Sequence, residues 1–207
     1  MTHTCLVRPL RIFLGLLTWG ILTLSTFAWA QSPRMLPGID AVMVGDSITA
    51  AGPWQTMFPN VRVVNKAVSG FTTYDTLREM KSILALKPKK AFVMIGINDL
   101  MRQGSVRQTF DNIMLIVKQL QQNNIAVYIQ ATLECSRDRC GSIVQSVRDL
   151  NQRLKAAAEA SQIPFIDLNP ALTGMSQGLL PAYTADGLHL LAPAYVIWGD
   201  ALKPYIQ

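Results

Sequence analysis

The chain has 207 residues, of which 50% are hydrophobic and 15% charged, and its formal net charge is +6. This composition excludes a disordered tail and provides enough apolar material for the core of one domain. The basic residues are scattered, apart from a small cluster at Lys87, Lys89 and Lys90, so we expect no nucleic-acid partner.

The first thirty residues have the pattern of a secretory signal peptide. Arg8 and Arg11 precede an uncharged run over 12–30 that ends in Ala-Trp-Ala. We expect cleavage after Ala30, a periplasmic or secreted location, and no stable membrane insertion afterwards. An uncleaved anchor is the alternative, because about 19 uncharged residues nearly suffice to span a bilayer. The mature protein would be a single domain of residues 31–207.

After the signal peptide, short β-rich runs alternate with helical stretches. We expect strands at 40–44, 61–68, 90–97, 125–133 and 163–168, and helices at 72–88, 105–124, 142–161 and 192–205. Such alternation is typical of a mostly parallel, five-stranded sheet with helices on both faces, a three-layer α/β/α sandwich. Ser105 with Gln108, and Ser142 with Gln145, predict capping boxes at two of the helix starts.

Cys135 and Cys140 are the two cysteines that remain after cleavage, in the sequence CSRDRC. An exported protein meets an oxidising compartment, and so close a pair favours a local disulfide worth about 2 kcal/mol. A metal site would need about two to four further ligands, and Asp138 alone does not supply them. We therefore predict the disulfide in preference to a metal site.

Polar residues follow the predicted strands at the edge where parallel sheets bind ligands. They are Gly45-Asp46-Ser47, Ser69-Gly70, Asn98-Asp99 and, after a long loop, Asp186-Gly187-Leu188-His189. Taken singly, each group could simply cap a helix or form a turn. Together they bring chemically complementary side chains to one edge of one sheet.

His189 is the only histidine outside the predicted signal peptide, and Asp186 precedes it by three residues. A carboxylate beside an imidazole fixes its tautomer, and an imidazole base is what a serine hydroxyl needs to become a nucleophile. We therefore predict a catalytic triad of Ser47, His189 and Asp186. Asp46 is the rival carboxylate, but neighbouring side chains on a turn diverge, so we interpret it as a structural hydrogen-bond acceptor.

Three groups could form an oxyanion hole beside this triad. Ser47 would offer its own N–H group at a strand-to-helix turn, and Gly70 would let a backbone N–H approach closely. Asn98 would add a neutral amide donor. Trp54, Phe71, Tyr183 and Trp198 could line a substrate site, although we expect at least half of them to belong to the core.

At these residues the chain resembles the SGNH, or GDSL-type, serine hydrolase family. Four blocks occur in the family's order: VGDSIT with Ser47, NKAVSGFTT with Gly70, GIND with Asn98, and DGLH with Asp186 and His189. The resemblance implies a flavodoxin-like fold and the same triad and oxyanion hole. Ala67 and Leu190 depart from residues common in the family and leave the subfamily open.

The resemblance further implies a two-step acyl transfer that needs no metal or cofactor. We predict a carboxylic ester hydrolase that removes short acyl groups, such as acetyl, from a carbohydrate or small ester, because no long apolar insertion or lid interrupts the chain. A periplasmic thioesterase or lysophospholipase, an O-acetyltransferase with the same triad, and a non-catalytic binding module remain alternatives. The sequence leaves the oligomeric state open.

Overall fold

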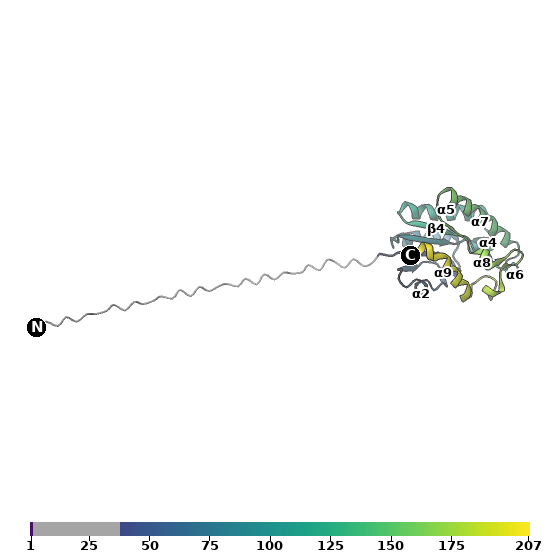
Figure 1. Ribbon diagram of the computed structural model, residues 1–207. Helices are drawn as coiled ribbons and strands as arrows, with labels where there is room; N and C mark the ends of the chain where they lie inside the picture. The colour runs from purple at the N-terminus through teal and green to yellow at the C-terminus, as the bar shows by residue number, and fades with distance from the viewer. Residues whose placement is uncertain (2–37) are drawn as a thin grey trace. The chain divides into compact units, whose positions relative to one another are not determined.

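A parallel five-stranded sheet forms the centre of the domain (Figure 1). The computed structural model describes Met1 and residues 38–207, so the predicted signal peptide, apart from Met1, and its cleavage site lie outside the described residues. The strands are β1 (Ala41–Gly45), β2 (Val63–Asn65), β3 (Lys90–Met94), β4 (Ala126–Gln130) and β5 (Phe165–Ile166). Their order is β2-β1-β3-β4-β5, and all neighbours pair in parallel.

Helices cover both faces of this sheet. The long ones are α3 (Thr73–Leu84), α5 (Val106–Gln122), α7 (Ile143–Ala160) and α9 (Ala192–Ile206). Figure 1 shows α5 and α7 on one face and α9, with the short α2 (Trp54–Met57), on the other. Because α3 packs against α5 and α5 against α7, these three helices form one layer. The predicted α/β/α sandwich is confirmed.

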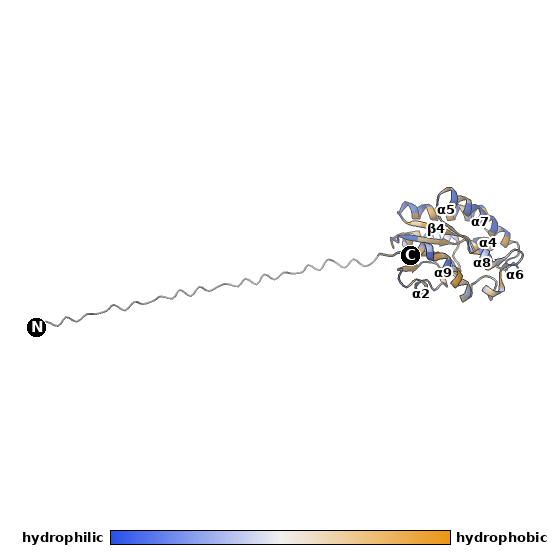
Figure 2. Ribbon diagram, in the orientation of Figure 1, coloured by the Kyte–Doolittle hydropathy of each residue, from blue (hydrophilic) through white to orange (hydrophobic). Residues whose placement is uncertain are grey.

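Burial follows the polarity of these elements. β1 is buried throughout, as is β3 after its first residue. Along α5 and α7, hydrophilic and hydrophobic segments alternate (Figure 2), and each helix buries an apolar stripe that includes Ile113 and Leu120 in α5, and Val147 and Leu154 in α7. Amphipathic helices on buried strands are the arrangement that the sequence predicts.

Several observed elements are shorter than predicted. The segment 61–68 forms a strand only over β2, because the chain then leaves the sheet towards the turn at Gly70. The segment 90–97 forms a strand only over β3, because the chain leaves the sheet and α4 begins at Ile97. The remaining elements are short: α1 (Ser47–Ala50), α4 (Ile97–Met101), α6 (Arg137–Cys140), α8 (Asn169–Leu172), the hairpin β6 (Thr173–Gly174) and β7 (Gly178–Leu179), and the 3₁₀ helix η1 (Pro181–Tyr183).

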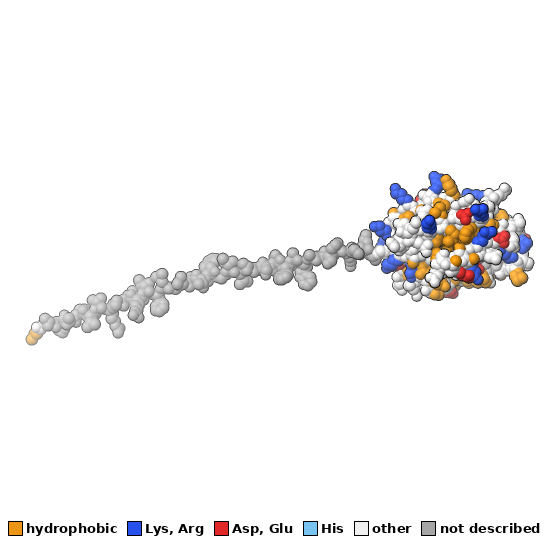
Figure 3. All heavy atoms as spheres, turned by 90° about the horizontal axis from the view of Figure 1, so that it is seen from above, with side chains coloured by type: hydrophobic (Ala, Val, Ile, Leu, Met, Phe, Trp, Pro, Cys, Tyr) orange, Lys and Arg blue, Asp and Glu red, His pale blue; other side chains and the backbone are white. Residues whose placement is uncertain are grey.

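The predicted disulfide is present: Cys135 and Cys140 are bonded, with their α-carbons 6.1 Å apart. Among the described helices, none is long and apolar enough to cross a membrane. Within residues 38–207, no group of three or more His, Cys, Asp or Glu side chains is arranged to hold a metal ion. On the face drawn in Figure 3, basic side chains are interspersed with acidic and apolar ones and form no stripe.

Candidate active site

The order of the sheet reverses between β1 and β3, and open α/β sheets bind ligands at the carboxyl ends of strands at such a switch point. Ser47 follows β1 directly as the first residue of α1. Asn98 lies in α4, which begins shortly after β3, and Gly70 lies in the turn that follows β2. The strand order thus places these residues around one point.

The turn that carries Ser47 is built by its neighbours. A side chain on Gly45 would clash with Thr49 and with the Met94 carbonyl, so only glycine lets the chain turn so closely against β3. The buried Asp46 caps α1 by accepting a hydrogen bond from the Ile48 N–H at 3.0 Å. Ser47 therefore holds the first helical position, where the backbone N–H has no partner inside the helix.

Two aromatic side chains hydrogen-bond α1 to neighbouring helices. Trp54 donates from its indole nitrogen to the Thr49 carbonyl at 2.8 Å, and the Tyr195 hydroxyl donates to the Ile48 carbonyl at 2.7 Å. These bonds join α1 to α2 and α9. They also satisfy carbonyl groups that so short a helix leaves free.

Ser47, His189 and Asp186 lie in a hydrogen-bonded row. The Ser47 hydroxyl oxygen is 2.9 Å from His189 Nε2, and His189 Nδ1 is 2.7 Å from Asp186 Oδ2. The other Asp186 oxygen accepts the backbone N–H groups of Leu188 at 2.9 Å and His189 at 2.8 Å. One carboxylate thus shapes the turn and orients the imidazole. These bonds, chiefly the one from the His189 side chain, hold the pKa of Asp186 well below its ordinary value.

Asp46, the rival carboxylate, is bonded to Ile48 and not to His189. Burial, the largest cause, raises the pKa of Asp46 to about 7, although the Ile48 N–H and the charge of His189 act in the opposite direction. The structure therefore gives the two aspartates different environments, one buried as a helix cap and one half-exposed beside the histidine.

Gly70 lies in a tight turn next to the strand end that leads to Ser47. The Phe71 N–H donates to the Val68 carbonyl at 3.2 Å across this turn, and Gly70 has φ +80°, the value that favours glycine at the third position of a type II turn. The Val68 N–H donates to the Gly45 carbonyl at 3.1 Å. That bond holds the turn against the end of β1.

Asn98 contacts the same turn from α4. Its side-chain nitrogen donates to the Phe71 carbonyl at 2.9 Å, which engages one of its two amide hydrogens and leaves the second for another acceptor. The next residue, Asp99, accepts the Thr73 N–H at 2.9 Å and the Thr73 hydroxyl at 2.6 Å. The Asn98 amide is therefore held beside the Gly70 turn.

The disulfide loop supports the turn that carries His189, a connection that the sequence does not reveal. The Ser136 N–H donates to the Gly187 carbonyl at 2.7 Å, and the Leu179 N–H donates to the Cys135 carbonyl at 3.3 Å. Gly187 has φ +79°, and a side chain there would clash with Ser136. The histidine turn thus rests on the segment that the disulfide closes.

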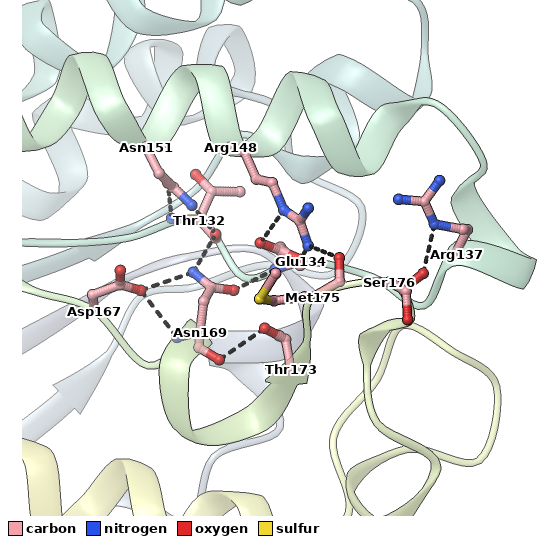
Figure 4. A network of polar contacts seen from close by, with 10 residues as sticks. All are labelled: Thr132, Glu134, Arg137, Arg148, Asn151, Asp167, Asn169, Thr173, Met175 and Ser176. Atoms are coloured by element: carbon pink, nitrogen blue, oxygen red, sulfur yellow. Dashed lines mark hydrogen bonds and ion pairs between the residues drawn. The ribbon is translucent and has the colours of Figure 1, made fainter.

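A polar network anchors that segment to α7 (Figure 4). Arg148 donates two hydrogen bonds of 2.9 Å to the buried Glu134, and a third of 3.1 Å to the Met175 carbonyl. Asn169 links the Glu134 N–H with the Thr132 carbonyl and with Asp167. The Glu134 carboxylate therefore pairs with an arginine of α7.

Two of the four aromatic residues that could line a substrate site belong to the core, in agreement with the expectation that at least half would. Trp54 and Trp198 are 2% and 0% exposed and pack edge to face in the core. Phe71 and Tyr183 are partly buried against that core.

The site itself is open, since the side chains of His189 and Asp186 are 48% and 46% exposed. A hollow of about 280 Å³ lies elsewhere, beside Glu134 and Arg148.

The fold and the hydrogen-bonded row define an α/β domain with serine, histidine and aspartate at its switch point. The model of the GDSL-like lipase/acylhydrolase family matches residues 43–197. The chain therefore belongs to this family.

Individual relatives agree with this assignment. An acetylxylan esterase of Geobacillus stearothermophilus is 27% identical over 174 residues, which cover 72% of this chain and 75% of that protein. A GDSL-like lipase from Bacteroides thetaiotaomicron has a similar structure, with a TM-score of 0.74 at 26% identity, covering 81% of this chain and 87% of that one.

Another relative is a larger protein. An N-acylneuraminate cytidylyltransferase of Streptococcus agalactiae is 28% identical over 170 residues, 78% of this chain and 39% of that protein. The chain thus spans about two fifths of the length of this curated relative.

Proposed function

We propose that this protein is an exported serine ester hydrolase that removes short acyl groups, such as acetyl, from a carbohydrate or small ester. The observation that carries the proposal is the row from Ser47 through His189 to Asp186, with its contacts of 2.9 and 2.7 Å. Membership in an acylhydrolase family and similarity to an acetylxylan esterase support ester hydrolysis.

The proposed reaction proceeds in two acyl-transfer steps. Asp186 holds the Nδ1 proton of His189, so Nε2 can accept the proton of Ser47 as the serine oxygen attacks the ester carbonyl. His189 then protonates the leaving alcohol, and an acyl-enzyme remains on Ser47. Water repeats the sequence and releases the acid.

The negative charge that develops on the carbonyl oxygen would be stabilised by three donors. These are the N–H groups of Ser47 and Gly70 and the free amide hydrogen of Asn98, and together they form the proposed oxyanion hole. Each donor is fixed before the substrate binds, so its alignment costs little in the transition state. The loss of one such donor typically costs about 3 kcal/mol of transition-state stabilisation.

The openness of the site favours hydrolysis of short acyl esters over the alternatives. The half-exposed His189 and Asp186 leave room for water, which competes with the second alcohol that an acetyltransferase must bind. A polymer-borne acetyl group can reach such an open triad. A thioesterase or lysophospholipase with a long acyl chain would need an apolar groove to cover that chain.

A series of p-nitrophenyl esters of increasing acyl length tests the proposal, with wild type and Ser47→Ala compared. We expect kcat/KM to be highest for acetate, and Ser47→Ala to lose activity about a thousandfold or more while it remains folded. Wild-type-like turnover by Ser47→Ala would show that Ser47 is not the nucleophile. Activity that rises towards eight carbons would refute the short-acyl assignment and favour the lipid or thioester alternative.

A further inference from the structure

Helix α4 and Arg102, the residue directly after it, hold two consecutive carbonyl groups of the turn that contains Gly70. The Asn98 amide donates to the Phe71 carbonyl at 2.9 Å, and Arg102, one helical turn later, donates from Nη2 to the Gly70 carbonyl at 2.9 Å. Among the described residues, Arg102 alone donates a hydrogen bond to the Gly70 carbonyl.

This bond bears on the proposed oxyanion hole because the carbonyl and N–H groups of Gly70 share one α-carbon. Gly70 lacks a side chain that would restrict its rotation, and its φ of +80° is one of several backbone conformations open to glycine. The Val68 N–H fixes one end of the turn to Gly45, and Arg102 fixes the carbonyl of Gly70 itself. The Phe71 N–H, which belongs to the same peptide group as this carbonyl, bonds the Val68 carbonyl at 3.2 Å and restrains the group from its other side. Loss of the Arg102 bond would therefore loosen Gly70 and let its N–H turn away from the position of the oxyanion.

We infer that Arg102 is a positioning residue for the oxyanion hole, an inference that rests on the proposed function. Its guanidinium holds Gly70 in the conformation in which the Gly70 N–H faces the developing charge. Arginine suits this task because its planar group is always charged and keeps its donors in a fixed geometry. Arg102 itself makes no contact with the reacting atoms in this account.

The test is steady-state kinetics of Arg102→Gln and Arg102→Lys with the neutral substrate p-nitrophenyl acetate. We expect Arg102→Gln to lower kcat about tenfold or more with KM nearly unchanged, less than the loss of about 10²–10³ when a donor is removed outright. Lysine can still donate to the carbonyl, so Arg102→Lys should retain an intermediate kcat. Arg107→Gln is the matched control, because Arg107 is an exposed arginine paired with Asp111 on α5.

Chemical rescue separates positioning from general destabilisation. Guanidinium ion, added to Arg102→Ala far below the concentrations that unfold proteins, should restore part of kcat, and it should leave Arg107→Gln unchanged. All variants are assayed below their measured unfolding temperatures, so that a lower kcat does not result from unfolding.

Three results would overturn the inference. One is a wild-type kcat in Arg102→Gln, and another is a loss of kcat that guanidinium does not restore. The third is an effect on KM alone that is confined to negatively charged esters, which would make Arg102 a substrate-binding residue. Inactivity of Ser47→Ala alongside any of these results would leave the proposed function standing.

Discussion

At the scale of single residues, Asp46 and Asp186 show how position sets the behaviour of one side-chain type. Asp186 is half-exposed and accepts hydrogen bonds from His189 and from the backbone, which stabilise its charged form. Asp46 is buried next to Ser47, which stabilises its protonated form. The charged carboxylate is therefore the one that faces the imidazole.

The environment of Asp46 predicts a pH dependence of stability. Its pKa rises from 3.8 to about 7 on folding, so between these values the unfolded chain releases a proton that the folded chain keeps. The free energy of unfolding should therefore fall as the pH rises from about 4 to about 7. Asp46→Asn, which can still cap α1, should reduce this slope in urea unfolding experiments at several pH values.

The control is Asp138→Asn, which removes an exposed carboxylate and should keep the wild-type slope. Part of the slope should survive in Asp46→Asn, because burial also raises the pKa of Asp99. An Asp46→Asn protein with the full wild-type slope would contradict the prediction.

Ser47, Gly70 and Asn98 could be predicted to lie together because each comes shortly after a strand of a parallel sheet. The strands before these three residues end at one edge of the sheet, and His189 is the only histidine outside the predicted signal peptide. Arg102 was missed, because an exposed arginine past the end of a short helix has no sequence signal for a contact with a carbonyl thirty-two residues earlier.

At the scale of elements, the disulfide loop and the turn of His189 are one unit. The Ser136 N–H bonds the Gly187 carbonyl, and Arg137 donates from its backbone to the Gln177 carbonyl, both at 2.7 Å. A second bond of 2.7 Å runs from the Arg137 side chain to Ser176. The loop that the disulfide closes thus joins the hairpin β6–β7 to the residues that hold the histidine.

Removal of the disulfide should therefore affect both stability and turnover. The double variant Cys135→Ser with Cys140→Ser should be less stable by about 2 kcal/mol, from the entropy of so short a loop. We expect kcat to fall while KM changes little, because His189 loses part of its support. Thermal unfolding and esterase kinetics measure the two effects.

Reducing agent provides the matched control. It should lower the kcat of the wild type to that of the double variant and leave the double variant unchanged. A double variant with wild-type kcat would show that the loop does not position His189.

Helix starts show what local sequence could not settle. Ser105 accepts the Gln108 N–H as predicted, but the Gln108 side chain bonds Asn112, so that box is half formed. Ser142 makes no capping bond, since its backbone is already helical, with φ −68° and ψ −16°. Within residues 38–207, a complete capping box is formed by Thr72 and Asp75 at the start of α3. A serine or glutamine at a helix start can bond several different groups, and the tertiary structure decides which of these bonds forms.

At the scale of the whole molecule, the fold was predictable because alternating apolar strands and amphipathic helices have few compact solutions. The structure of the connection over 169–188 was not predictable, because α8, η1 and the small hairpin are too short to give a periodic pattern of apolar residues in the sequence. Their positions depend on long-range partners, such as the bonds of Arg148 and Asn169 to the strand ends.

Export remains a prediction at this scale, and the disulfide supports it because disulfides persist in oxidising compartments. Expression of the full chain in a bacterial host should yield a periplasmic or secreted protein whose N-terminus is Gln31. Edman sequencing or intact-mass analysis of the purified protein checks this outcome. A product that keeps residues 1–30 and sediments with membranes would favour the uncleaved anchor.

In the proposed mechanism, His189 makes Ser47 the nucleophile of this protein. Labelling by a serine-reactive phosphonate, followed by peptide mass spectrometry, tests it most directly. We predict one label per chain, on Ser47, and labelling that is slowed strongly in His189→Ala. Label on another residue, or equally fast labelling of His189→Ala, would contradict the claim.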